Sequence, residues 1–248
     1  MITMAKYLLF LLSLYCVSCD VPPEASAGGL IEKTIQAHGW NQKKPALISF
    51  DFRDHHYEIQ RDPKGIAMQR AILEPKDSLV DRWLNYTHFS RSSQGKAVVV
   101  SDSMQNVYAQ SINSVVYFMQ LPLGLQDPAV LASHEGVTEI AGQSYEVLKV
   151  GFKEQGGGED FQDSFYYWIH AKEYTIDYMA YSYHTNGGGT RFRVAKNAQN
   201  IKGFRFQDYD NYKPAKHPTP LDSMPYLWEA GQLKLLSRIE NENLRVVL

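Results

Sequence analysis

The order of hydrophobic and polar residues indicates one long amphipathic helix in a chain that otherwise consists of short strands. Between residues 101 and 120 the apolar side chains recur at steps of three and four, the spacing of one helix face. They are Met104, Val107, Tyr108, Ile112, Val115, Val116 and Met119. Ser101 is a residue type that caps helices, and Pro122 stops continuation. The pattern predicts a helix over 101–120 that packs onto a sheet.

Shorter helices are predicted at 29–38 and 221–230, and nearly all other apolar runs have the length and composition of strands. These runs are 46–53, 56–61, 79–91, 96–100, 136–152, 163–170, 174–184, 189–196, 202–212 and 235–247. Short turns between successive runs predict an antiparallel meander, and the helical spacers of a parallel doubly wound sheet are missing. We therefore expect one β-rich α+β domain over residues 29–248.

The run 163–170 is apolar or amphipathic on both faces of the predicted strand. One face carries Phe165, Tyr167 and Ile169, and the other carries Tyr166, Trp168 and His170. Sheets that are covered on both sides have strands of this type. We expect one face to pack on helices and the other to lie in a curved, partly covered sheet.

The N-terminal segment has the layout of a secretory signal peptide. Lys6 precedes an apolar run from Tyr7 to Val17, which is too short to span a bilayer as a helix. The following "CVSC" at 16–19 resembles a bacterial lipobox, so we predict a signal peptide over 1–18, lipidation at Cys19 and a tether over 19–28. The chain would then be a membrane-tethered lipoprotein of the cell envelope. The alternative is an ordinary soluble secretory protein.

Cysteine count and charge narrow the function classes further. Both cysteines lie in the N-terminal segment, so a disulfide framework is not expected in the mature domain. The chain has 25 basic and 27 acidic residues without a block of like charge. This balance argues against a nucleic-acid partner.

The stretch "SYHTNGGGTRFR" at 182–193 is predicted to be a hairpin tip and not a phosphate loop, because no Gly-Lys-Ser/Thr and no helix follow the glycines. If Thr185 faces Thr190, then Ser182, His184, Arg191 and Arg193 share one face. Two guanidinium groups and a histidine there would suit a carboxylate, sulfate or phosphate headgroup. The alternative is that the arginines pair with Asp177 or Asp208 on adjacent strands.

Catalytic and metal motifs give no positive signal. The acidic loop at 156–163 lacks the spacing of an EF-hand, and the chain has no H-E-x-x-H motif or Cys/His cluster. Ser93 and Lys96 match S-x-x-K spacing without a K-T-G partner motif, and no G-x-S-x-G is present. We assign no catalytic residue, no metal ligand and no cofactor.

Four stretches carry a family resemblance: "SVVYFMQLPLGLQDPAV" (114–130), "GGGEDFQDSFYYWIH" (156–170), "DYMAYSYHTNGGGTRFR" (177–193) and "GFRFQDYDNYKP" (203–214). On these the chain resembles a family of uncharacterised lipoproteins from Bacteroidota that carries a domain of unknown function. That family is similar in architecture to periplasmic lipoprotein carriers. The resemblance implies a strongly curved antiparallel sheet that forms an incomplete barrel, with helices packed across its concave face. It also implies a space between sheet and helices that accepts acyl chains.

Together these observations predict a non-enzymatic, monomeric envelope lipoprotein that binds an apolar or lipid-like ligand. The candidate ligand contacts are Ser182, His184, Arg191, Arg193, Trp168 and Tyr178. A scaffold or interaction module is the first alternative, favoured if the space between sheet and helices falls below about 300 Å³. A hydrolase of envelope or extracellular polymers is the second, and it needs convergent carboxylates or a Ser/His pair in a cleft.

Overall fold

The computed structural model describes residues 26–41, 45–72, 79–155, 161–184 and 187–248. The helices are α1 (Ala27–Ala37), α2 (Asp102–Met119) and α3 (Met224–Glu229), with 3-10 turns η2 (Leu123–Gln126) and η4 (Leu221–Ser223). None of the helices in the described ranges is long and apolar enough to cross a membrane.

Two seven-stranded sheets form the body of the protein, and every pair of neighbouring strands is antiparallel. The first sheet has the order β14-β1-β2-β3-β4-β5-β6, from strands β1 (Ala46–Phe52), β2 (His55–Asp62), β3 (Gly65–Ile72), β4 (Leu79–Leu84), β5 (His88–Ser93), β6 (Lys96–Val98) and β14 (Glu242–Val247). The second has the order β13-β12-β11-β10-β9-β8-β7, from strands β7 (Val130–Ile140), β8 (Gln143–Phe152), β9 (Ser164–His170), β10 (Ile176–Tyr183), β11 (Gly189–Ile201), β12 (Phe204–Lys213) and β13 (Lys234–Ile239).

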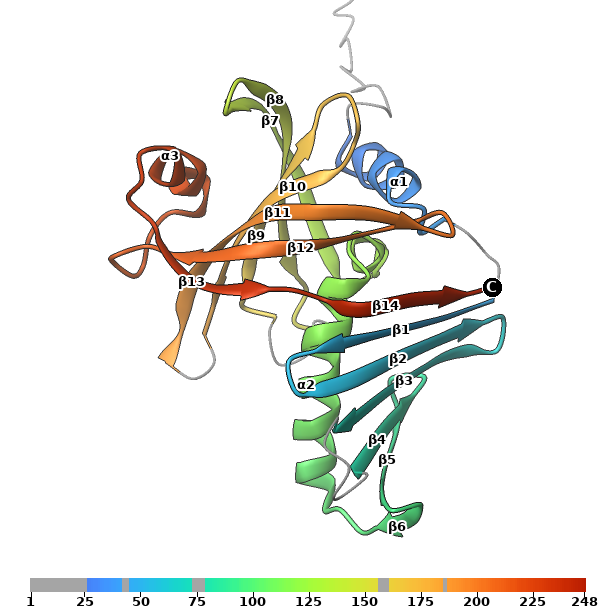
Figure 1. Cartoon of the computed structure of the whole chain (residues 1–248). Coiled ribbons are helices and arrows are strands. Elements are labelled where there is room, and N and C mark those ends of the chain that lie inside the picture. Colours follow the sequence, from blue (N-terminus) through green and yellow to red (C-terminus); the bar gives the residue numbers. More distant parts are fainter. Residues whose placement is uncertain (1–25, 42–44, 73–78, 156–160, 185–186) are drawn as a thin grey trace, which may run out of the picture.

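The two sheets meet where the chain passes from β13 into β14, two strands that lie end to end (Figure 1). We call Glu240 and Asn241, the two residues between these strands, the seam. Asp208 of β12 accepts a hydrogen bond from the Asn241 N–H at 3.0 Å. Asp51 of β1 accepts one from Asn243 Nδ2 at 2.7 Å. Each sheet therefore fixes one side of the seam.

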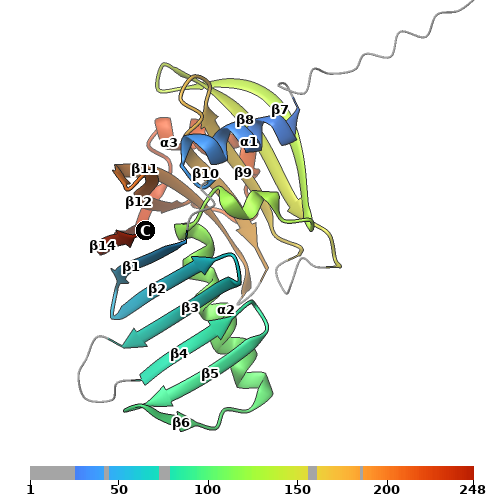
Figure 2. The ribbon, with the colours of Figure 1, turned by 90° about the vertical axis from the view of Figure 1, so that its right-hand side faces the viewer.

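The edge strands β6 and β7 lie at opposite ends of this arrangement and do not pair with each other in the described chain. The sheets with α1 and α2 enclose one large core, which includes Ile48, Phe50, Ile112, Val116 and Tyr167. Figure 2 shows α1 across the second sheet and α2 along the first. The predicted α+β fold, a curved antiparallel sheet with helices packed on it and no closed barrel, is confirmed.

Helix α2 confirms the predicted element, but its apolar stripe is only partly covered. Ile112, Val116 and Met119 are buried, whereas Met104 and Val107 are 38% and 55% exposed. The first turns of α2 lie beside β3–β6, away from the second sheet (Figure 1), so they have only one sheet to pack against. The Ser101 side chain makes no capping hydrogen bond and lies 3.2 Å from Ser103 Oγ.

A buried carboxylate connects β3, β4 and β5 beneath α2. Asp81 is 3% exposed and accepts hydrogen bonds from Arg70 at 2.7 Å and from Arg91 at 2.6 and 2.9 Å. Arg70 also donates to Ser111 Oγ of α2, and the Arg91 guanidinium lies 3.5 Å from the ring centre of Tyr108. Burial alone would raise the pKa of Asp81, but the hydrogen bonds from the two arginines outweigh it and lower that pKa. This cluster fixes the first half of α2 to the sheet.

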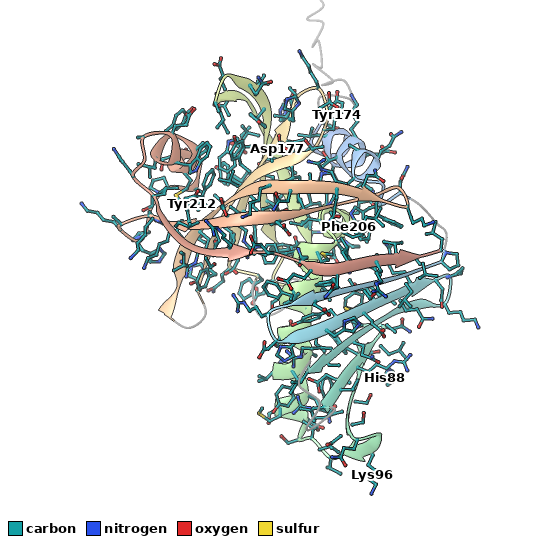
Figure 3. The ribbon with its side chains drawn as sticks, viewed as in Figure 1. His88, Lys96, Tyr174, Asp177, Phe206 and Tyr212 are labelled. Carbon is teal, nitrogen blue, oxygen red and sulfur yellow. The ribbon has the colours of Figure 1, made fainter. Side chains whose placement is uncertain are left out.

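The outer face of the second sheet has its own core, covered by α3 and η4. Trp168, Tyr178 and Phe192 pack there with Met224 of α3, and Tyr212 of β12 lies on the same side (Figure 3). Strand β9 is therefore covered on both faces, as its sequence predicts. The 221–230 helix, however, lies on the face opposite to α1 and α2.

Several predicted boundaries differ from the structure because tight turns were not recognised. The runs 79–91, 136–152 and 235–247 each contain two strands, and β3 was not predicted. Asn85 and Tyr86 turn the chain with positive φ, and Ala141 with Gly142 does the same between β7 and β8. Helix α1 starts at Ala27, two residues inside the predicted tether, because Ser26 Oγ accepts from Gly29 N at 3.1 Å.

Helix α1 is attached to the second sheet through a buried histidine. His38 Nε2 accepts a hydrogen bond from Ile176 N at 3.1 Å. Burial and the positive charge of Arg205 lower the pKa of His38 to about 3. The imidazole is therefore a neutral acceptor in the folded protein at neutral pH.

We expect Asp81→Asn to lower the free energy of unfolding by about 3–5 kcal/mol, because breaking a buried ion pair leaves uncompensated charges. Urea unfolding followed by tryptophan fluorescence measures this. Arg82→Gln removes an exposed charge at the next position. This control variant should change the free energy of unfolding by less than about 0.5 kcal/mol. Equal effects of the two variants would contradict this role of Asp81.

Stability should fall as the pH drops from 6.5 towards 3, because the unfolded chain then binds a proton at His38 that the folded chain does not. The contribution is at most about 1.4 kcal/mol per pH unit. His38→Gln keeps an acceptor for the Ile176 N–H without titrating. The free energy of unfolding should therefore change less per pH unit in this variant. Urea unfolding between about pH 6.5 and pH 5, above the range in which carboxylates titrate, provides the comparison. An unchanged slope would contradict the assignment.

Candidate ligand-binding site

A cavity of ≈ 400 Å³ lies beneath the seam, between α2 and the inner face of the second sheet. Helix α2, the end of β1, four strands of the second sheet and the seam itself contribute to its wall. The lining residues are Phe52, Arg53, Ser114, Val115, Phe118, Met119, Tyr181, Tyr183, Arg193, Gln207, Tyr209, Asn211, Ser237, Ile239 and Asn241. We call this space the seam cavity.

One wall of the seam cavity is apolar and comes mainly from α2. Val115, Phe118 and Met119 occupy consecutive steps along the helix face that is turned towards the sheet. Phe118 packs against Tyr181 with ring centres 5.7 Å apart. Such a surface can hold an apolar chain, because removing it from water is favourable and needs no polar partner.

The opposite wall carries a row of polar side chains across three strands. Arg193 of β11 faces Asn211 of β12, and Asn211 faces Ser237 of β13. Asn211 Nδ2 donates to Ser237 Oγ at 3.0 Å, while Asn211 Oδ1 is buried without a hydrogen-bond partner. We call Arg193, Asn211 and Ser237 the polar row.

Arg193 is the unusual member of this row because it is a buried cation. It is 8% exposed, and its guanidinium carbon lies 3.9 Å from the ring centre of Phe118. Nη2 donates to the Tyr181 hydroxyl at 2.9 Å, and Nε has no hydrogen-bond partner. Aromatic faces attract a guanidinium group, by roughly 2 kcal/mol when both are desolvated. They do not neutralise its charge.

No carboxylate of the described ranges forms an ion pair with Arg193. Burial raises the pKa of the nearby Tyr209 phenol, although a hydrogen bond from Gln207 and the charge of Arg193 oppose this rise. That phenol therefore stays neutral at physiological pH. Buried arginines are normally paired, so the seam cavity has an uncompensated positive charge.

The two aspartates expected as partners of the arginines bind elsewhere. Asp177 accepts from Thr175 Oγ1 at 2.8 Å and from the Tyr145 hydroxyl at 3.3 Å. It lies at the start of β10, near the α1 end of the molecule (Figure 3). Asp208 accepts from Asn197 Nδ2 and from the seam. The alternative that Asp177 or Asp208 neutralises Arg191 or Arg193 is thus wrong.

The hairpin predicted from the triple glycine is confirmed, but the predicted register is wrong. Strands β10 and β11 pair with Ser182 opposite Thr190 and Tyr181 opposite Arg191. This differs from the expected pairing by an odd number of residues, so side chains change faces. Ser182 therefore lies on the face opposite to Arg191 and Arg193. Thr185 and Asn186, on which the predicted register depended, lie outside the described residues.

The other predicted contacts are also distributed over different places. Trp168 and Tyr178 lie in the outer core beneath α3. His184 is exposed, and its Nδ1 is 3.4 Å from Asp163 Oδ1. Arg191 donates to the Thr190 carbonyl and to the Tyr183 hydroxyl. Of the six predicted residues, Arg193 is the one that lines the seam cavity.

Sequence reasoning missed most of the lining because it lies on strands that are distant in the chain. Gln207, Tyr209 and Asn211 alternate along β12 and so share its inner face. Polar residues at alternate positions within an otherwise buried strand were the available signal. The contribution of Ser237 depends on the β12–β13 pairing, which no local pattern specifies.

The described lining contains no aspartate, glutamate or histidine. In the described part of the chain, no group of three His, Cys, Asp or Glu residues is arranged to hold a metal ion. The site thus offers donors and apolar surface, without a paired acid and base.

Comparison with known proteins gives a family and a set of distant structural neighbours. Residues 5–241 match the model of a family of unknown function, DUF6503. No curated protein matches the sequence. The chain is similar in structure to a DUF1329 family protein from Desulfovibrio piger, with 9% identity, a TM-score of 0.49, and coverage of 88% of this chain and 92% of that chain.

Two further solved structures are similar to the chain. A LolA superfamily protein from Nitrosomonas europaea has 11% identity, a TM-score of 0.48, and coverage of 89% of this chain and 93% of that chain. An outer membrane lipoprotein-sorting protein domain from Vibrio parahaemolyticus has 8% identity, a TM-score of 0.42, and coverage of 74% and 84%.

We expect Arg193→Met to leave the free energy of unfolding of the ligand-free protein unchanged or to raise it by about 1–4 kcal/mol, because an apolar group of similar volume replaces a buried charge. Urea unfolding of delipidated protein measures this. A loss of more than about 2 kcal/mol would contradict this expectation and would show that Arg193 stabilises the fold.

Proposed function

The chain belongs to the DUF6503 family, whose function is unknown, and we propose that it is a lipid-anchored envelope protein that binds an apolar or lipid-like ligand in the seam cavity. The observation that carries this proposal is the cavity itself, ≈ 400 Å³ of space between α2 and the curved sheet. That volume falls within the range of about 300–1,000 Å³ that small-molecule sites occupy.

The chemistry of the lining supports a ligand with an apolar chain. Val115, Phe118 and Met119 supply one wall, and the rings of Phe52 and Tyr181 extend it. Arg53 and Ser114 are exposed members of the lining, so they mark a side of the cavity that solvent reaches. A chain could enter between the end of β1 and α2 without passing through the core.

A binding role accounts for the site better than the two alternatives. A scaffold without a ligand has no use for a cavity of this size next to an unpaired buried cation, since both reduce stability. A hydrolase needs two carboxylates or a Ser/His pair, and the described lining provides neither.

The proposed attachment to the membrane uses Cys19. Residues 1–25 lie outside the described residues, so the signal peptide over 1–18 and the tether from 19 to 25 remain predictions from the sequence, whereas residues 27 and 28 belong to α1. The described residues start at Ser26, the N-cap of α1, and six residues separate it from Cys19 in the sequence. Acyl chains on Cys19 would hold the domain beside the membrane that contains its ligands.

Photo-cross-linking tests whether a ligand binds in the seam cavity without assuming which headgroup that ligand carries. Membranes containing the full chain would be exposed to two tagged alkyl diazirine probes of equal length, one with a carboxylate and one with an alcohol head. We expect at least one probe to label α2 between Ser114 and Met119 or the facing strand β10. Mass spectrometry of the labelled peptides locates the adducts, and an absence of labelling by both probes would overturn the proposed function.

Val115→Trp should lower this labelling by about tenfold or more, because the introduced indole occupies space that the ligand needs. A loss of about 1.4 kcal/mol of binding free energy already makes binding tenfold weaker. Val107→Trp is the matched control on an exposed part of the same helix, and labelling should persist there. The urea midpoint of each variant shows whether it is folded. Equal labelling of both folded variants would place the ligand elsewhere.

Cys19→Ala should move the protein from the membrane fraction to the soluble fraction, because acyl chains on Cys19 are its proposed anchor. Fractionation followed by immunoblotting measures the distribution. Replacement of Cys16 by alanine is the control and should leave the protein with the membranes. Membrane retention of the Cys19 variant would contradict the predicted lipidation.

A further inference from the structure

We infer that the ligand of the seam cavity carries a single negatively charged head, a carboxylate or a phosphate monoester, which binds the polar row through Arg193. This inference rests on the proposed function and adds the chemical class of the ligand. It depends on the charge of the cavity, whereas the proposed function depends on its volume and apolar wall.

The charge balance of the cavity favours an anionic head. Its described lining includes two arginines, Arg53 and Arg193, and no acidic residue. Arg53 is exposed, so water compensates its charge, but Arg193 is 8% exposed and has no carboxylate partner in the described ranges. A buried ion without a counter-ion costs several kcal/mol. An anionic ligand head would remove this cost.

The free donors of Arg193 are available to a carboxylate or phosphate. Arg193 Nη2 is used by Tyr181, while Nε has no partner. Phe118 lies against the guanidinium at 3.9 Å and holds its plane. A carboxylate or phosphate can accept from a guanidinium group through two oxygens, and such charge-assisted hydrogen bonds are about twice as strong as neutral ones.

The rest of the polar row also has unused hydrogen-bonding capacity. Asn211 is 7% exposed, and its Oδ1 atom has no partner. Ser237 Oγ can donate as well as accept, so the Asn211 amide can present either its oxygen or its NH₂ group to the cavity. The polar row can therefore bind an ionised head whether or not that head also carries a hydroxyl group.

Arg191 makes a matched comparison because it lies two residues away on the same strand and face. Its guanidinium donates to the Thr190 carbonyl and to the Tyr183 hydroxyl, and it does not line the cavity. The two arginines thus have the same charge and nearly the same position, but they differ in free donors and in access to the cavity.

The test compares labelling by the carboxylate and alcohol probes in membranes that contain the full chain. The two probes can partition unequally into the bilayer. Comparing the ratio of their labelling yields between variants removes this effect, because it is the same for every variant. We expect Arg193→Met to lower the carboxylate-to-alcohol ratio by about tenfold or more, as expected for loss of a charge-assisted hydrogen bond. Arg191→Met should keep the ratio within about twofold of the original chain, because Arg191 does not line the cavity and its donors are used by the Thr190 carbonyl and the Tyr183 hydroxyl.

Competition identifies the source of the negative charge. Dodecanoate and dodecyl phosphate should each displace the carboxylate probe, whereas acetate and inorganic phosphate at the same concentration should not. Displacement by the short anions at equal concentration would show a site for a free anion and would overturn the inference of an anionic amphiphile.

An unchanged ratio in Arg193→Met would overturn the inference while leaving the proposed function intact, because the alcohol probe would still label the cavity. Loss of labelling by both probes in the original chain would instead remove the proposed function. If Arg193→Met does not fold, Arg193→Gln removes the charge and keeps hydrogen-bond donors. An unchanged ratio in that folded variant would overturn the inference equally.

Discussion

The seam at Glu240 and Asn241 is the constraint on which the rest of the structure depends. One extended segment supplies the edge strand of both sheets, since β13 pairs with β12 and β14 pairs with β1. The sheets are therefore joined at one place and separate away from it, and α2 has to span both. Asp208 and Asp51 hold the segment from either side, so the seam is also the place where the two sheets are fixed to each other. The seam cavity lies directly beneath this junction.

Two arginine environments beneath α2 show how the fold separates stability from binding. Arg70 and Arg91 share the buried carboxylate of Asp81, and together they fix the first half of the helix. Arg193, next to the second half of the helix, is buried and has aromatic neighbours in place of a carboxylate. Arg70 and Arg91 have a carboxylate partner within the chain, whereas Arg193 would gain an anionic partner from a bound ligand. This difference is the physical basis for proposing an anionic head on the ligand of the seam cavity.

Local patterns predicted most of the elements, although β3 and several tight turns were missed, and long-range pairing decided the site. The three- and four-residue periodicity of 101–120 predicted α2, and the two apolar faces of β9 predicted a sheet covered on both sides. The register of the β10–β11 hairpin could not be read from the triple glycine, because a shift by an odd number of residues changes which side chains face inward. Arg193 was found for its chemistry, but Ser182 was placed with it on the wrong assumption about register. Asn211 and Ser237 join Arg193 only through pairings between strands that are distant in the sequence.

The central claim is that the polar row holds the charged head of an acyl ligand within the seam cavity. The most direct measurement is the lipid content of the full chain purified from its own membranes, with single-chain acidic lipids quantified by mass spectrometry per molecule of protein. The account predicts that such a lipid is retained by the original chain and by Arg191→Met and is lost from Arg193→Met. Equal retention in all three proteins, or an absence of bound lipid from the original chain, would contradict it.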